Sequence, residues 1–103
     1  MRQFDVYQNP SERSRAYAPL VVVLQSHLLE AMPTAVVAPM LLAANRKAYT
    51  QVSAEVIFSD EHYIVSTAEL VATDAKRLSR LMGDLRDQED AIRRALERLF
   101  TGF

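Results

Sequence analysis

Residues Tyr17 to Ser26 read YAPLVVVLQS, and this stretch decides the fold class. Its apolar, mostly β-branched residues are consecutive and do not alternate with polar ones, which is typical of a strand covered on both faces. We expect one face to meet the core and the other to meet a further layer, for example a second subunit. Pro19 has no amide hydrogen to donate, so we place it at the start of the strand or on an edge.

The segments on either side of this stretch also have the pattern of strands. Val52, Ala54, Val56 and Phe58 fall on one face of an extended chain, with more polar residues between them. Pro39 lies within an apolar run and argues that its strand is at an edge or contains a bulge. Strands are expected at residues 4–7, 35–41, 51–58 and 63–67, with a hairpin closed by residues 59–62 and a short strand or extended segment at 68–74.

After Asp74 the spacing of apolar residues changes to three and four, which predicts helix. Gly83 is expected to divide this region into two helices, and Asp84 or Asp87 to cap the second. Phe100 closes the apolar stripe and is therefore expected in the core. The residues of the stripe are Leu78, Leu81, Leu85, Ala91, Ile92, Ala95, Leu96 and Leu99. Strands followed by a terminal helix predict an α+β fold.

Composition sets limits on organisation and location. With 103 residues, half of them hydrophobic, residues 1–103 are expected to form one domain with one modest core. The net charge of -1 gives no overall field that would attract nucleic acid or an anionic membrane. The first ten residues have no apolar signal region, and the longest apolar run, Leu20 to Leu24, is too short to span a bilayer. We expect a cytoplasmic protein.

The residue types that carry chemistry are sparse. The chain has no cysteine, and its two histidines, His27 and His62, lie in different elements without a helix-spaced carboxylate, so no metal site is predicted. Its only glycines are Gly83 and Gly102, which excludes a glycine-rich phosphate loop. No catalytic residue and no cofactor is therefore predicted, and a nucleotide-hydrolysing enzyme is not expected.

Several short motifs, in order and spacing, resemble the CcdB family, the toxins of CcdA/CcdB toxin-antitoxin pairs. They are QFDVY at residues 3–7, LQSHLLE at residues 24–30, SDEHY at residues 59–63 and LFTGF at residues 99–103. The resemblance covers the whole chain. It implies a curved antiparallel β-sheet, an SH3-like barrel of CcdB/MazF type, followed by a C-terminal α-helix, and a homodimer formed through the sheet.

The resemblance also implies a function without catalysis. CcdB toxins bind the A subunit of DNA gyrase, trap the enzyme on cleaved DNA and are neutralised by the antitoxin CcdA. We therefore expect gyrase and a CcdA-like antitoxin as partners, with no direct binding of nucleic acid or membrane. The positions that correspond to the gyrase-binding surface are Gln3, Phe4, Tyr7, Ser26, Leu28, Leu29, Glu97, Thr101, Gly102 and Phe103.

The sequence departs from the family at Thr101, where CcdB toxins carry a tryptophan that matters for gyrase binding. Loss of such an interface residue costs roughly 2 kcal/mol or more, or about thirtyfold in affinity. Phe103, two positions later, offers an aromatic ring that could replace it. Gln3, Phe4 and Tyr7 could equally be strand residues that pack beside the helix.

Two other readings remain open at this point. The first is an endoribonuclease of the MazF type, which shares the fold and would use Arg13, Arg15 and Thr67. The second is a diverged CcdB homologue that keeps the fold and the antitoxin but no longer poisons gyrase, because of Thr101.

Overall fold

The computed structural model describes residues 1–26, 28, 31–45 and 52–102. The strands are β1 (Asp5–Gln8), β2 (Leu20–Val23), β3 (Thr34–Leu42), β4 (Ser53–Phe58), β5 (Glu61–Ser66), β6 (Val71–Asp74) and β7 (Leu81–Asp84). Short 3₁₀ turns are η1 (Glu12–Ser14), η3 (Ala43–Asn45), η4 (Thr67–Glu69), η5 (Ala75–Arg77) and η6 (Arg86–Gln88), and the helix α1 spans Glu89–Thr101. Strands come first and the helix last, which confirms the predicted α+β class.

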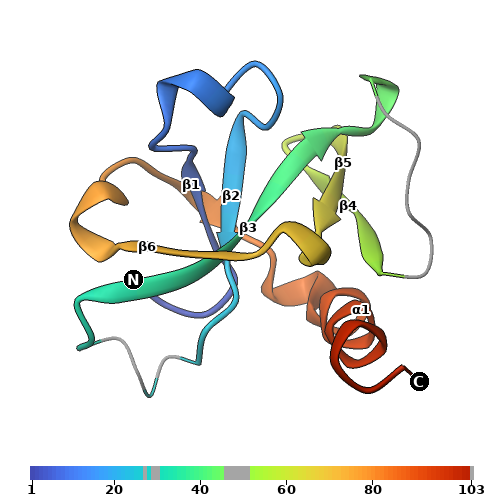
Figure 1. Cartoon of the computed structure of the whole chain (residues 1–103). Coiled ribbons are helices and arrows are strands. Elements are labelled where there is room, and N and C mark those ends of the chain that lie inside the picture. Colours follow the sequence, from blue (N-terminus) through green and yellow to red (C-terminus); the bar gives the residue numbers. More distant parts are fainter. Residues whose placement is uncertain (27, 29–30, 46–51, 103) are drawn as a thin grey trace.

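The described strands form one antiparallel sheet that curls into a half-barrel with α1 at one side (Figure 1). Their order is β4-β5-β3-β2-β1-β7, and β6 pairs with one end of β3. The side-chain amide of Gln88 joins η6 to the outer strand β4. It accepts a hydrogen bond from the backbone N–H of Ile57 at 2.8 Å and donates one to the carbonyl of the same residue at 2.7 Å. Gln88 thus takes the place of a neighbouring strand at this position.

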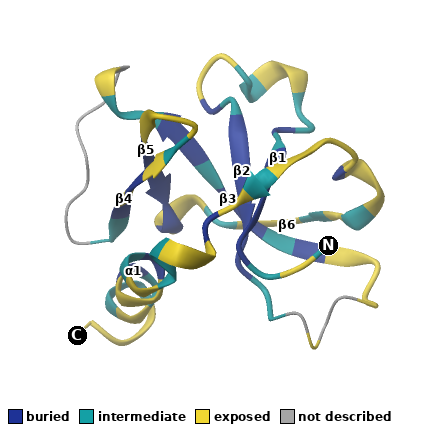
Figure 2. Ribbon diagram, turned by 180° about the vertical axis from the view of Figure 1, so that it is seen from behind, coloured by how far each residue is buried: buried dark blue, intermediate teal, exposed yellow. Residues whose placement is uncertain are grey.

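Strand β2 is covered on both faces, as its sequence predicts. Leu20 and Val22 belong to the main core, which also contains Met40, Val56, Val65 and Leu85 and is closed by Ile92 and Ala95 of α1. Val21 and Val23 belong to a second cluster with Tyr7, Ala35, Val37 and Leu78. Figure 2 shows β2 and much of β3 in the colour of buried residues. Because the second cluster comes from the same chain, covering these faces does not require a second subunit.

The hairpin between β4 and β5 is confirmed. Ala54 and Val56 are buried while Glu55 and Ile57 are exposed, so the predicted alternation is present. The turn is Ser59 and Asp60, whose φ angles are 50° and 62°. Two consecutive residues with positive φ make a type I′ turn, whose twist matches the strands that it joins.

The expectation that Pro39 marks an edge or a bulge is wrong. Pro39 lies in β3, which is a central strand, opposite Val21 of β2. On the other side of β3, the pairing with β6 ends at Val37 and the pairing with β5 begins at Met40. Pro39 therefore falls where β3 passes from one neighbour to the next, and its missing N–H leaves no partner unsatisfied there.

The first predicted helix does not exist. Residues 75–77 form a 3₁₀ turn and residues 81–84 form β7, which pairs with β1. Leu78 belongs to the second cluster and Leu85 to the main core, whereas Leu81 is exposed, so the three leucines do not share a face. Gly83 lies within β7 with a φ of 153° and divides no helix. Pairing with β1 outweighs the local helical pattern.

The terminal helix is confirmed, but neither predicted aspartate caps it. Helix α1 begins at Glu89, its N-cap residue is Gln88, and no side chain caps it. Asp84 acts one turn earlier, where its carboxylate accepts a hydrogen bond from the backbone N–H of Arg86 at 3.1 Å. Glu89 pairs with Arg93 at 3.1 Å, which is an i,i+4 ion pair on the solvent face.

Candidate protein-binding surfaces

The C-terminal end of α1 carries an exposed aromatic ring. Phe100 is 70% exposed, so its expected place in the core is wrong. The helix buries Ile92 and Ala95, and Phe100 lies eight residues after Ile92, roughly a quarter turn away from that face. The chain then ends the helix at Gly102, which adopts the left-handed conformation with a φ of 79° and donates its N–H to the carbonyl of Arg98.

Thr101 contributes little polarity to this surface. Its hydroxyl donates a hydrogen bond of 2.6 Å to the carbonyl of Glu97, one turn back in the helix, so its donor is already used within the helix. Glu97 and Gly102 are exposed as well. Phe103 lies outside the described residues.

The N-terminal positions of the predicted surface are mostly buried. Phe4 is 2% exposed and packs in the main core, with the guanidinium carbon of Arg93 5.3 Å from the centre of its ring. Tyr7 is buried in the second cluster, where burial raises the pKa of its hydroxyl and the Asp5 carboxylate raises it further. Gln3 uses its side-chain amide to bond the carbonyl of Leu24 at 3.0 Å. For Phe4 and Tyr7, burial favours the packing role that the sequence left open.

The remaining predicted positions lie in the segment after β2. Ser26 is partly buried, and its hydroxyl accepts a hydrogen bond from the N–H of Leu28. Leu28 is 83% exposed, and Leu29 lies outside the described residues. In Figure 1 the start of β3, which follows this segment, lies at the left of the view, and the C-terminal end of α1 lies at the right.

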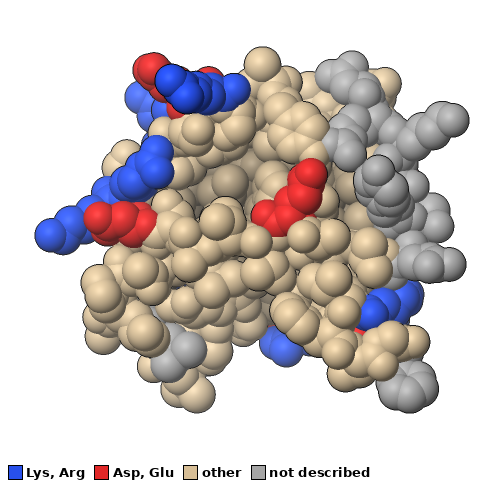
Figure 3. Space-filling view, viewed as in Figure 1, with Lys and Arg blue, Asp and Glu red and all other residues tan. Residues whose placement is uncertain are grey.

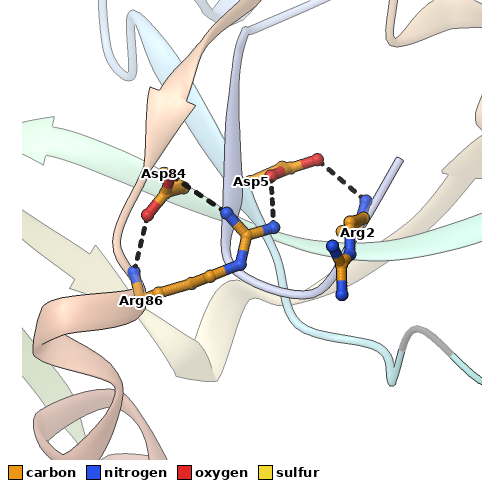
Figure 4. A network of polar contacts seen from close by, with 4 residues as sticks. All are labelled: Arg2, Asp5, Asp84 and Arg86. Atoms are coloured by element: carbon orange, nitrogen blue, oxygen red, sulfur yellow. Dashed lines mark hydrogen bonds and ion pairs between the residues drawn. The ribbon is translucent and has the colours of Figure 1, made fainter.

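A network of charges holds the N-terminal segment against the end of β7 and the turn η6 that precedes α1 (Figure 4). Arg86 pairs with Asp5 at 2.8 Å and with Asp84 at 3.0 Å, and Asp5 also accepts the backbone N–H of Arg2 at 2.8 Å. The Asp5 side chain is only 11% exposed, and these partners compensate for the water that its carboxylate has lost. Sequence reasoning missed this network, because Asp5 and Arg86 are 81 positions apart and carry no local signal.

A groove of about 470 Å³ lies on the face shared by η1, β2, β3 and β6. Figure 3 shows this face as a hollowed and mostly uncharged surface, with an acidic side chain at the centre and basic ones at the left margin. The groove is lined by Asn9, Pro10, Ser11, Ser14, Tyr17, Ala18, Val21, Val37, Pro39, Glu69, Val71, Ala72, Thr73 and Arg77. No sequence pattern indicates this groove, since its lining comes from four separate segments.

Arg13, Arg15 and Thr67, the residues expected for a ribonuclease, do not form a catalytic site in the structure. Thr67 is fully buried, and its hydroxyl donates to the carbonyl of Val52. Arg15 uses its Nε to bond the carbonyl of Asn9 at 2.7 Å, within the same loop, and Arg13 is exposed. Within the described ranges, no three His, Asp or Glu side chains are placed to hold a metal ion. No helix in the described part of the chain is long and apolar enough to cross a membrane.

Comparison with known proteins identifies the family. The family model described as CcdB protein matches residues 3–102, which is nearly the whole chain. The chain belongs to the CcdB family. It is thus a toxin of a toxin-antitoxin pair, and membership of the CcdB family implies an antitoxin partner.

Solved structures of toxins share the fold of this CcdB-family chain. The Mycobacterium tuberculosis toxin MazF-mt6 matches with a TM-score of 0.71 and 19% identity, over 96% of each chain. A structure described as that of an Mtb toxin matches with a TM-score of 0.67 and 20% identity, over 79% of this chain and 91% of the other. A comparison with curated proteins found no match. At these identities the structural matches establish the fold alone, and they confirm the predicted MazF-type half-barrel with its C-terminal helix.

Proposed function

We propose that this CcdB-family chain binds the A subunit of DNA gyrase as a homodimer in the cytoplasm and holds gyrase on cleaved DNA, without catalysing a reaction. The observation that carries the proposal is the exposed end of α1, which includes Thr101 and Gly102, two of the positions that correspond to the gyrase-binding surface of the family, and beside them Phe100. There the ring of Phe100 is 70% exposed and the helix stops at Gly102, whose bare backbone has nothing within 4 Å of a Cβ position. An exposed ring beside open backbone is a suitable anchor for a protein interface.

A homodimer would place two such helix ends in one assembly. A two-fold dimer presents the same patch twice, and a partner that is itself two-fold symmetric can meet both copies at once. Binding at two sites raises the apparent affinity without any new kind of contact. Dimerisation also offers a way to combine Leu28 of one chain with the helix end of the other. Leu28 is 83% exposed and available for this role.

The proposal is tested with purified protein, gyrase, ATP and supercoiled plasmid. After treatment with detergent and protease, a gyrase poison yields linear DNA, because the cleaved strands are held open until the enzyme is removed. Omitting gyrase is the control and should leave the plasmid intact. Intact plasmid with gyrase present, at protein concentrations well above those of gyrase, would contradict the proposal.

A second candidate is an endoribonuclease of the MazF type, which the similarity in fold to MazF-mt6 favours. The burial of Thr67 speaks against the residues first considered for it. Incubation with a long single-stranded RNA in place of plasmid separates the two. Cleaved RNA with intact plasmid would establish the ribonuclease.

A third candidate is a homologue that keeps the antitoxin but has lost gyrase poisoning. It is favoured by Thr101, whose hydroxyl bonds to its own helix and leaves no large side chain at that position. Antitoxin binding without effect on plasmid or RNA would identify this case.

A further inference from the structure

The groove between η1 and β6 has an apolar floor and two unlike walls. Its floor is formed by Val21 of β2 and by Val37 and Pro39 of β3. One wall is the loop around η1, with Pro10 and Tyr17, and the other is β6. Val21 and Val37 are already buried, so the apolar area that a ligand can still cover lies in the walls, where Tyr17 is 43% and Val71 is 55% exposed. Covering this area would be favourable, at about 25 cal/mol for each Å² removed from water.

Strand β6 has an open edge beside this floor. Among the described strands β6 pairs only with β3, from Val37 opposite Val71 to Thr34 opposite Asp74. Val71 is 55% exposed, and Val71, Ala72 and Thr73 line the groove. An unpaired edge presents backbone donors and acceptors that can pair with another extended chain.

Opposite charges lie at the two ends of β6. Glu69, in η4, precedes the strand, and Arg77, in η5, follows it, and both line the groove. Glu69 accepts a hydrogen bond from the hydroxyl of Tyr17, at 2.6 and 2.9 Å to its two oxygens, and Arg77 donates to the carbonyl of Pro10 at 3.3 Å. The groove thus has an acidic end, a basic end and an apolar middle.

We propose that this groove binds an extended segment of a partner polypeptide, which adds to β6 as an antiparallel strand. The segment places an acidic side chain near Arg77, apolar side chains against the exposed wall residue Val71, and a basic side chain near Glu69. Antiparallel pairing is the more stable arrangement and fixes this order, acidic residue first. The inference rests on the proposed function only in taking the antitoxin as the protein that supplies the segment.

A second copy of this chain is a poorer occupant, although its own β6 carries complementary charges. Because the groove has a wall on each side, the occupant must be a single extended segment. The β6 strand of another copy is already paired with its β3 along one edge, so the second strand would meet the wall around η1. A free segment has no such second strand.

The test uses two synthetic peptides, capped at both ends, with a core of alternating valine and threonine. One reads Glu-Val-Thr-Val-Thr-Lys, and the other has its Glu and Lys exchanged. We expect the unmodified protein to bind the first roughly tenfold more tightly in calorimetry, because exchange sets two like-charge pairs in place of two opposite ones. The double variant Glu69→Lys/Arg77→Glu should reverse this preference. The matched control Glu61→Lys/Arg80→Glu, at exposed positions outside the groove, should not.

Hydrogen exchange distinguishes strand addition from binding by charge alone. The first peptide should slow exchange of β6 amides that do not bond β3, and a peptide N-methylated in its core should bind at least tenfold more weakly. Any of three results would overturn the inference. The first is equal binding of the two peptides, and the second is no protection of β6 amides. The third is a dimer in solution that Val71→Lys dissociates and whose interface blocks the peptide. None of these measurements involves gyrase, so failure of gyrase poisoning would leave their outcome unaffected.

Discussion

The ring of Phe58 covers Gly83 so closely that a Cβ on the glycine would lie 2.9 Å from Cε1 of the ring. These residues belong to β4 and β7, the two ends of the strand order, so their contact closes the half-barrel. The φ of Gly83, 153°, lies in a region that residues with a side chain rarely adopt. Position 83 therefore requires glycine for two reasons, the lack of room for a Cβ beside the Phe58 ring and the positive φ of the backbone.

Replacing this glycine is expected to be costly. Gly83→Ala should lower the free energy of unfolding by about 2–4 kcal/mol, from backbone strain and overpacking together. Chemical denaturation measures the change. In the double variant with Phe58→Leu the clash is relieved while the strain stays, so the two effects should be less than additive. Full additivity would show that the ring does not constrain position 83.

Arg86 is the ion-pair partner of the nearly buried Asp5 carboxylate. Arg86→Met should lower the free energy of unfolding by about 1–3 kcal/mol, because it leaves a carboxylate that is only 11% exposed without its guanidinium partner. Glu89→Gln is the matched control, since it removes an ion pair on the exposed helix face and should cost less than about 0.5 kcal/mol. Equal losses in the two variants would mean that the network at Asp5 contributes no more than a surface pair.

Two buried tyrosines should limit stability in alkali. Burial raises the pKa of Tyr7 and Tyr63 above the ordinary value near 10, with smaller contributions from Asp5 and Glu61. The folded chain then holds these protons more tightly than the unfolded chain does. Stability is unchanged below about pH 9 and falls above pH 10, where the unfolded tyrosines ionise first. Tyr7→Phe should reduce the slope of unfolding free energy against pH above 10. An unchanged slope would contradict the assignment to Tyr7.

Phe100 is expected to be an anchor for gyrase. Phe100→Ala should weaken binding to the gyrase A subunit by roughly thirtyfold in surface plasmon resonance, as loss of a central aromatic residue does. The melting temperature should stay nearly the same because the ring is 70% exposed. Met82→Ala, at another exposed apolar residue, should leave binding unchanged. Unaltered affinity in Phe100→Ala would remove this ring from the proposed interface.

Thr101→Trp should raise gyrase affinity, because it adds a large ring beside Phe100. The substitution gives up the hydrogen bond from the Thr101 hydroxyl to Glu97, a small cost at an exposed position. Thr101→Val removes the same hydroxyl without adding a ring and is the matched control. A pulldown in which tryptophan and valine behave alike would count against an aromatic hot spot at this position.

The sequence predicted the elements whose signal is local. Alternation along 52–58 and the turn after it identified β4 and its hairpin, and the apolar stripe from Ile92 to Leu99 identified α1. Strand β7 was missed because its pairing with β1 joins residues about eighty positions apart. Pro39 was misjudged because no local pattern tells where a strand passes from one neighbour to the next.

The site was less predictable than the fold. A helical stripe indicates which side faces the sheet but not where the sheet ends, so Phe100 was placed in the core although it is exposed. The family resemblance supplied Phe4 and Tyr7 as contacts, and only the packing showed that both are buried. The groove beside β6 depends on residues from η1, β2, β3 and β6 together and has no signature in any one of them.

The two clusters on either side of β2 separate folding from assembly. Since one chain supplies the cover for both faces of its own central strand, a newly synthesised copy can reach its native state while it is still alone. Once dilution has dissociated the proposed dimer, the thermal transition of the monomer should stay at the same temperature on further dilution. Such a toxin folds without waiting for a second copy, so an antitoxin that neutralises it must be present when the toxin is synthesised.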